Sequence, residues 1–213
     1  MSLTLRAGIS WCVCARQAVF LDLVGDRYFC LPETLDAIFR RWADGGAIDP
    51  AGRDALIAAG VAEPGTGSPP AAACYPAATH DLANGTQHRS IPITLAAIVG
   101  QLRAQRRLKR EPLADILTDL APLGRADPGN DGLLGRIASA FATSGMLLRA
   151  ADQCLPRAIA AARLCRRRGQ QVALILGVRL DPFAAHSWVQ SGDAVVVGDF
   201  EQVRLYTPIL VVQ

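Results

Sequence analysis

The chain has 213 residues, of which 51% are hydrophobic and 19% are charged, and its net charge at pH 7 is +3. This length suits one domain or two small ones, and the hydrophobic content is ample for a core. The longest apolar stretches, such as 172–178, are far shorter than the roughly 20 residues of a membrane-spanning helix. The N-terminus lacks the charged start and long apolar middle of a secretory signal. We therefore expect a cytoplasmic protein with no membrane partner.

Charge is unevenly distributed along the chain. Residues 1–100 contain 7 arginines and 9 acidic residues, a balance of −2, whereas residues 101–213 contain 15 basic and 10 acidic residues, a balance of +5. This difference predicts two distinct domains. The basic runs at 106–110 and 166–168 each follow a helical apolar pattern, where cations stabilise the C-terminal end of a helix. Because no aromatic residues interleave these runs, we expect no nucleic-acid partner.

The six cysteines do not follow a disulfide or metal-binding pattern. Thiols of a cytoplasmic protein stay reduced, so disulfides are not expected. Cys12 and Cys14 form a C-x-C pair without a second pair, and the three histidines are scattered. This spacing does not fit a zinc site. We expect neither a metal nor a cofactor.

Residues 1–63 predict a small winged-helix-like domain. Short segments of alternating polarity predict three antiparallel strands, at residues 8–15, 18–23 and 27–31. Pro32 then begins a helix whose apolar residues recur at helical spacing, namely Leu35, Ile38, Phe39 and Trp42. A second helix follows Asp49-Pro50.

Chain-breaking residues dominate the next segment, whose composition predicts a linker over residues 64–90. Beyond it, apolar residues at helical spacing predict helices at 93–107 and 133–148. Further helical and strand-like segments predict a C-terminal domain over 91–213, in which helices pack on an antiparallel sheet. The expected fold class is therefore α+β.

A third helix in this domain is predicted from Cys154 to Arg168, with Gly169 at its end. One face of it carries small side chains, at Cys154, Ala158, Ala161 and Cys165. Such a face lets a helix lie close to a sheet. The strands of that sheet are predicted at residues 171–180, 186–190 and 194–197, with a hairpin turn at Gly192-Asp193.

The start of this helix is a favourable place for a nucleophilic cysteine. Unpaired backbone N–H groups and the helix dipole lower the pKa of a thiol in the first turn, and Cys154 is placed there. Cys165 lies three turns further along and lacks this advantage, so we expect it to be inert. The backbone N–H of Cys154 is a natural oxyanion donor, whereas the sequence identifies no second donor.

A cysteine hydrolase also needs an imidazole beside the sulfur. His186 is the only histidine after Cys154, whereas His80 and His88 lie in a polar segment upstream. We therefore expect His186 to be the general base.

A carboxylate on the far nitrogen of the imidazole would complete a triad. Asp199 and Asp193 are both candidates. A hairpin about residues 192–193 would place Asp199 nearly opposite His186, which favours Asp199.

These residues resemble a known family. Cys154-Leu155-Pro156-Arg157-Ala158 opens a helix that ends in Arg-Arg-Gly, and His186-Ser187-Trp188-Val189 follows after Gly-Val. This pattern is similar to that of the lasso peptide biosynthesis B protein, a transglutaminase-like leader peptidase. The resemblance implies a papain/transglutaminase-like fold with a catalytic triad of Cys154, His186 and Asp199. The chain departs from the pattern at Gln190, where an acid is expected.

Residues 1–63 are similar to the PqqD-like precursor-recognition domain that many of these proteins carry. The resemblance implies a thiol protease of RiPP maturation that binds the leader of a precursor peptide as an added strand. Cleavage would free the core amine for an asparagine-synthetase-like lasso cyclase, the expected protein partner. Leader contacts are expected at Arg27, Tyr28, Phe29, Cys30 and Leu56.

Two other functions are compatible with the sequence. An acyl transferase on the same fold would replace water by an amine, and the triad does not distinguish the two reactions. A non-catalytic peptide-binding adaptor would use only the N-terminal domain. That domain is net acidic, which disfavours DNA binding.

Overall fold

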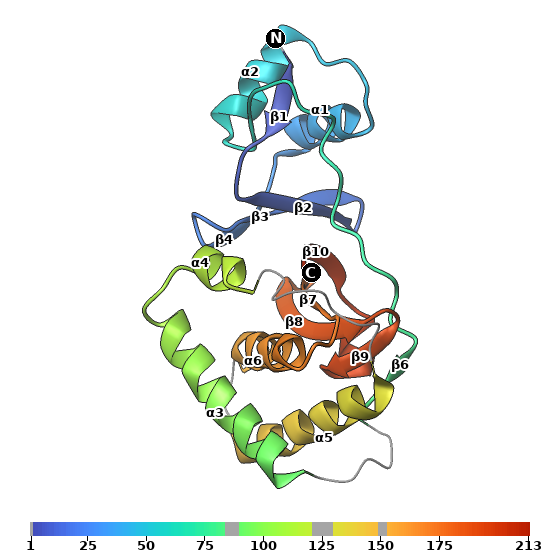
Figure 1. The fold of residues 1–213 in the computed structure, drawn as a ribbon. Helices are drawn as coiled ribbons and strands as arrows, with labels where there is room; N and C mark the ends of the chain where they lie inside the picture. Colours follow the sequence, from blue (N-terminus) through green and yellow to red (C-terminus); the bar gives the residue numbers. More distant parts are fainter. Residues whose placement is uncertain (1, 84–89, 121–129, 149–152) are drawn as a thin grey trace.

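The computed structural model describes residues 2–83, 90–120, 130–148 and 153–213, and it has the expected α+β architecture. Two units follow each other along the chain (Figure 1). We call residues 2–64 the N-terminal unit and residues 90–213 the C-terminal unit. His88 lies outside the described residues.

The N-terminal unit contains the predicted three-stranded antiparallel meander and two helices. Its strands are β2 (Ile9–Cys14), β3 (Gln17–Asp22) and β4 (Arg27–Cys30). Its helices are α1 (Glu33–Ala43) and α2 (Pro50–Ala58). Phe39 of α1 is fully buried and packs edge-on against Trp11 and Phe20 of the sheet, with ring centroids 4.8 and 4.7 Å apart. These aromatic contacts hold the helix on the sheet.

A two-stranded sheet that the sequence did not predict closes this unit. It pairs β1 (Leu3–Leu5) with β5 (Ala62–Pro64) in antiparallel register. Each strand has only three residues, too few for alternation to be recognised in the sequence. The beginning and the end of the unit therefore lie side by side.

The predicted linker runs along both units. Residues 65–79 form no helix or strand, and β6 (His80–Asp81) pairs in parallel with a strand of the C-terminal unit. The backbone N–H of Ala73 donates to the carbonyl oxygen of Trp11, at 2.9 Å. The side-chain amide of Gln190 donates to the carbonyl oxygen of Pro76, at 2.7 Å. This segment is thus bonded to each unit in turn.

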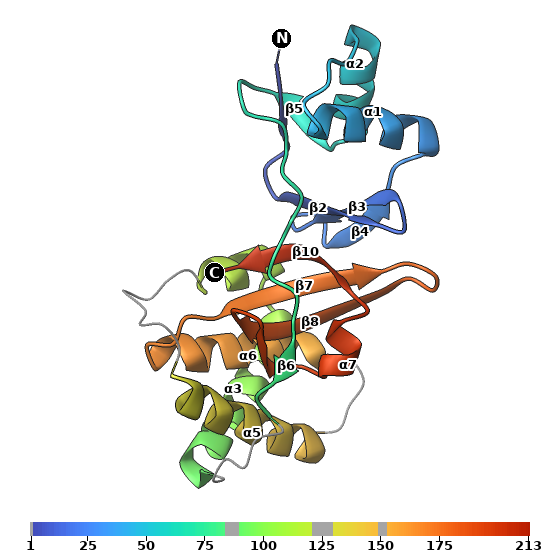
Figure 2. The same ribbon diagram turned by 90° about the vertical axis from the view of Figure 1, so that its right-hand side faces the viewer.

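Three helices of the C-terminal unit lie on the face of its sheet that points away from the N-terminal unit (Figure 2). They are α3 (Ile91–Leu108), α5 (Asp131–Leu147) and α6 (Cys154–Arg167). The short helix α4 (Leu113–Thr118), which was not predicted, lies near β4 of the N-terminal sheet (Figure 1). Ala158, Ala161 and Cys165 of α6 are at most 1% exposed, so the predicted small-residue face is buried against the sheet. Across the described residues, no helix has the length and hydropathy needed to cross a membrane.

The sheet of the C-terminal unit has five strands in the order β10-β7-β8-β9-β6. The chain forms β7 (Ala173–Arg179), β8 (Ala184–Ser191), β9 (Ala194–Val197), the short helix α7 (Phe200–Val203) and β10 (Thr207–Val212). The predictions of β7, β8 and β9 are confirmed, whereas β6, α7 and β10 were missed.

The two units share a hydrophobic core. The N-terminal sheet lies across β10, with α1 and α2 on its other face (Figure 2). Cys12, Val19 and Leu21 of this sheet belong to the same buried cluster as Val178 and Ile209. The position of the N-terminal sheet is therefore set by packing as well as by the connecting chain.

Gly177 of β7 tests the packing of a second cluster, in which Trp188 and Tyr206 lie against the C-terminal sheet. A Cβ at Gly177 would lie 2.7 and 2.8 Å from ring atoms of Trp188 and 3.1 Å from Cβ of Tyr206. We expect Gly177→Ala to lower the free energy of unfolding by about 1–3 kcal/mol, because overpacking forces these rings to move. Urea denaturation measures the change.

The matched control is Gly100→Ala in α3. A Cβ there would meet Cβ of Ala160 at 3.4 Å, and alanine is favoured over glycine in a helix by roughly 0.8–1 kcal/mol. This variant should be no less stable than the wild type. A Gly177→Ala protein of unchanged stability would contradict the packing described.

Candidate active site

Cys154 is the first residue of α6, as predicted, and its side chain is half-buried. Burial alone would raise the pKa of the thiol. Hydrogen bonds from the side chains of His186 and Ser187, the charge of His186 and the backbone N–H of Ser187 act in the opposite direction and outweigh it. The pKa of Cys154 falls from its ordinary 9.0 to about 7. The sulfur is therefore largely a thiolate at slightly alkaline pH.

β8 can contact the sulfur of Cys154 because its pairing with β9 does not extend to His186 and Ser187. β9 pairs with β8 only between Val189↔Val197 and Ser191↔Ala194. At His186 and Ser187, β8 is paired with β7 and has no ladder partner on the β9 side in the part of the chain that the structure describes. A backbone N–H on that side is available to bind the sulfur instead of a neighbouring strand.

The His186 ring is held between aromatic side chains. It stacks on Trp188 with an interplanar angle of 20°, and its centroid lies 5.2 Å from that of Tyr206. Its Nε2 is buried and has no hydrogen-bond partner among the described residues. The ring is thus oriented by packing, and one nitrogen remains available to an acceptor.

Asp199 lines a cavity together with Cys154 and His186. It follows β9 and caps α7, accepting hydrogen bonds from the N–H groups of Glu201 and Gln202 at 3.0 and 3.4 Å. Within the described residues, no hydrogen bond joins it to His186. Both residues border the same cavity.

Asp193, the other candidate, is placed differently. It lies in the turn between β8 and β9, where its carboxylate accepts a hydrogen bond from the hydroxyl of Thr79 at 2.6 Å. It lines neither of the two cavities that border Cys154. The geometry therefore favours Asp199 as the partner of His186.

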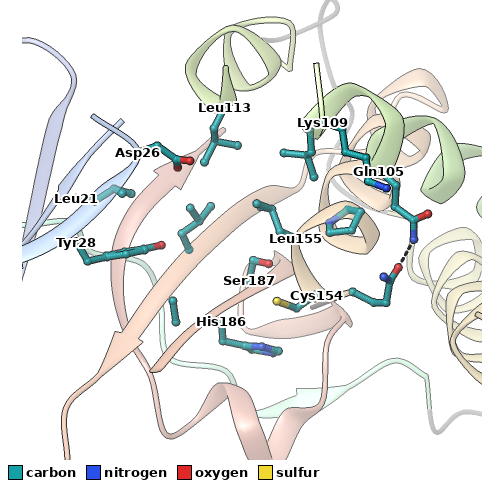
Figure 3. A pocket seen from close by; sticks show the side chains of 15 residues that line it. Leu21, Asp26, Tyr28, Gln105, Lys109, Leu113, Cys154, Leu155, His186 and Ser187 are labelled. Atoms are coloured by element: carbon teal, nitrogen blue, oxygen red, sulfur yellow. Dashed lines mark hydrogen bonds between the residues drawn. The ribbon is translucent and has the colours of Figure 1, made fainter. Parts of the chain in front are cut away.

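Cys154 lies between these two cavities. The larger has a volume of about 530 Å³ and is bordered on one side by the N-terminal sheet. The smaller has a volume of about 340 Å³ and is lined in part by Asp199 and Arg157. His186 and Ser187 also line both. Figure 3 shows the sulfur of Cys154 between the side chains of Ser187 and His186. A substrate lying across the sulfur could occupy a cavity on each side.

The residues predicted to contact a leader are not all accessible. Tyr28 lines the larger cavity, and Arg27 and Cys30 are exposed on β4. Phe29 stacks on Phe20 inside the N-terminal unit, with ring centroids 5.1 Å apart. Leu56 is fully buried in the same core, so its side chain cannot contact a bound peptide in this conformation.

Among the described residues, the other cysteines and His80 line neither of the cavities that border Cys154. Burial raises the pKa of Cys12 and of Cys165 to about 12, so their thiolates are scarce at neutral pH. His80 is exposed and lies within hydrogen-bond distance of the hydroxyl of Thr79. In the ranges that the structure describes, no three His, Cys, Asp or Glu residues are grouped to hold a metal ion.

Sequence reasoning missed Ser187. The residue is 4% exposed, and its hydroxyl has no hydrogen-bond partner of ordinary geometry among the described residues, yet it lies close enough to help lower the pKa of Cys154. Alternation along a strand predicts that neighbours such as His186 and Ser187 point to opposite faces. Only the position of the helix end beside β8 reveals that both meet the sulfur.

The hydrogen bonds of Gln190 explain why an amide, and not the expected acid, suits this position. Its side-chain oxygen accepts a hydrogen bond from the indole N–H of Trp188 at 3.0 Å, and its amide donates to the carbonyl oxygens of Pro76 and Gly192. A glutamate could accept the first of these but could not donate the other two. In this chain the amide therefore fixes Trp188, on which the His186 ring stacks.

Comparison with known proteins places the C-terminal unit in a family. A family model described as the transglutaminase-like superfamily matches residues 98–211, more than half of the chain. The match spans Cys154, His186 and Asp199. No curated protein and no solved structure shows significant similarity to the chain.

The pKa of Cys154 predicts a pH profile for alkylation. Because the thiolate is the reactive form, the rate with iodoacetamide should rise with pH through a midpoint near 7, while Cys12 and Cys165 stay unlabelled in the folded protein. His186→Ala removes a hydrogen bond and a charge, so the midpoint should move up toward 9.0. Mass spectrometry of each cysteine measures the rates. A wild-type midpoint near 9 would contradict the geometry.

Ser187→Ala tests the contribution of the Ser187 hydroxyl to the low pKa of Cys154. We expect alkylation of Cys154 at pH 6 to slow about 3- to 10-fold, which corresponds to a loss of roughly 0.7–1.4 kcal/mol. Ser191→Ala is the matched control, because Ser191 lies on the same strand and bonds only the carbonyl oxygen of Gln171 among the described residues. Equal rates for the two variants would show that the Ser187 hydroxyl does not act on the sulfur.

Proposed function

Because the chain belongs to the transglutaminase-like superfamily, we propose that it is a cysteine peptidase with the triad Cys154, His186 and Asp199. The superfamily includes cysteine proteases. The observation that carries the proposal is the thiol of Cys154 at a helix start, bonded by His186 and with its pKa lowered to about 7. A structural thiol in a half-buried position would have its pKa raised.

The reaction follows from the positions of these groups. The thiolate of Cys154 attacks a peptide carbonyl carbon, and the backbone N–H of Cys154 stabilises the oxyanion. His186 gives its proton to the leaving amine as the C–N bond breaks. Water then attacks the thioester while His186 accepts a proton, which releases the acid and restores the thiolate of Cys154 beside the imidazolium. Asp199 stabilises the imidazolium, which is present before the amine leaves and forms again during hydrolysis.

The substrate that we propose is the precursor of a lasso peptide. The resemblance of Cys154–Ala158 and His186–Val189 to the lasso B protein supports it, as does the N-terminal unit with its edge strand. Among the described residues β4 pairs only with β3, so a leader segment can add to its free edge. The product would be a core peptide with a free amine, the substrate of an ATP-dependent cyclase that acts as partner.

The arrangement of the two units suits this division of labour. The N-terminal sheet packs on β10, and Tyr28 of β4 borders the cavity that contains the sulfur. A leader held on β4 would therefore raise the local concentration of its own cleavage site beside Cys154.

Variants of the triad test the reaction on a purified leader–core precursor. We expect Cys154→Ala to abolish cleavage, and Asp199→Asn to lower kcat by about 10²- to 10⁴-fold because the imidazolium loses its stabilising charge. Asp193→Asn is the control and should cleave at the wild-type rate. Product masses separate hydrolysis from amide formation, the acyl-transfer alternative. Undiminished cleavage by Cys154→Ala would refute the proposal.

A further inference from the structure

The larger cavity beside Cys154 has walls from both units. Leu155 of α6, Leu176 of β7 and Leu113 of α4 form the side that belongs to the C-terminal unit, while Leu21 and Tyr28 come from the N-terminal sheet. Figure 3 shows the ring of Tyr28 reaching from β4 across the cavity toward Ser187 and Cys154. The N-terminal unit therefore forms one wall of the space next to the nucleophile.

Tyr28 is held firmly in this wall. Its ring contacts that of Phe183, with centroids 5.6 Å apart, on the connection between β7 and β8. Burial, with smaller contributions from the charges of Cys154 and Asp26, raises the pKa of Tyr28 to about 12. The thiol of Cys14, on β2 at the other edge of the same sheet, donates to the carbonyl oxygen of Val178 at 3.9 Å. Contacts on both sides thus fix the sheet that carries Tyr28.

The chemistry of the cavity favours an apolar group. Five leucines, Pro156 and the ring of Tyr28 line it, while polar groups come mainly from Gln105, Gln153, Asp26 and Lys109 and from the residues around the sulfur. The volume of about 530 Å³ exceeds that of any single side chain and leaves room for peptide backbone. Burying a large aliphatic or aromatic side chain there would strengthen binding by roughly 10- to 100-fold.

We propose that this cavity is the subsite for a large apolar side chain on the acyl side of the scissile bond, with Tyr28 as a specificity-determining residue supplied by the N-terminal unit. The inference rests on the proposed peptidase function. The acyl side is assigned because a segment captured on β4 precedes the scissile bond in its chain and reaches Cys154 through this cavity. The N-terminal unit would then have two roles. Its β4 edge would capture the leader of a long substrate, and Tyr28 would select the side chain beside the scissile bond, even in a short peptide.

Peptidyl chloromethyl ketones test the subsite without a precursor. The sulfur of Cys154 displaces chloride and forms an S–CH₂ bond, and the probe's side chains lie on the acyl side of its carbonyl. The full chain is treated with N-acetyl-Phe and N-acetyl-Phe-Gly chloromethyl ketones and with their Ser counterparts. Rates at Cys154 are measured by mass spectrometry and divided by the rates with glutathione and by the iodoacetamide rate of the same protein.

We expect one of the Phe probes to react at least about 10-fold faster than its Ser counterpart. Tyr28→Phe should keep this preference, because the ring remains. Tyr28→Ser should reduce the ratio of the Phe rate to the Ser rate to near the ratio that the two probes show with glutathione. Leu113→Gln, on the opposite wall, should reduce it as well and serves if Tyr28→Ser does not fold. Val24→Ser is the control, since Val24 is 74% exposed in the same unit and lines neither cavity that borders Cys154.

The outcomes separate this inference from the proposed function. If iodoacetamide labels Cys154 with a midpoint near pH 7 but the Phe and Ser probes react equally, the nucleophile stands and the subsite is refuted. A preference that survives both Tyr28→Ser and Leu113→Gln also refutes it. If no reagent labels Cys154 selectively, the peptidase proposal and this inference fail together.

Discussion

The packing of α6 on the sheet is the constraint on which the site depends. Ala158, Ala161 and Ala162 are at most 1% exposed, and their small side chains allow the helix axis to approach β8 closely. This approach places the first residue of the helix beside the point where β9 stops pairing with β8. The sulfur then receives donors that strand pairing has left unused. A larger side chain in this face would separate Cys154 from His186 without altering either residue.

A polar network joins the start of α6 to α3 and α5. Gln153 is the N-cap residue of α6, but its side chain makes no capping hydrogen bond to the helix. Its side-chain oxygen instead accepts hydrogen bonds from the amides of Gln101 and Gln105 of α3. Gln101 in turn accepts a hydrogen bond from Ser144 of α5, and both residues are fully buried. A connected network of this kind defines one arrangement of three helices, because any other leaves a buried polar group unsatisfied. Gln105 and Gln153 also line the larger cavity, so the network borders the proposed subsite as well as the helix start.

The sequence predicted the features that depend on local periodicity and missed those that depend on distant contacts. The start of α6 at Cys154 and the strands around His186 follow from residue patterns, because helices and strands have different periods. The expected facing of His186 and Asp199 assumed an uninterrupted hairpin, whereas the ladder has a register shift after Val189 and ends at Val197. The two residues therefore meet across a cavity. β10 pairs with β7 from far along the chain, and nothing local marks Tyr28 as a neighbour of the sulfur.

The pairing of β1 with β5 gives the N-terminal unit the geometry of an exchangeable module. Its first and last strands are hydrogen-bonded neighbours, with Leu3 opposite Pro64, and the unit contacts the rest of the molecule mainly through the packing of its sheet on β10. Replacing residues 2–64 by a related unit would disturb few covalent constraints. The replacement would also carry a new residue to the position of Tyr28, so that exchange of one module would alter both the sequence that is captured and the side chain that is accepted beside the sulfur.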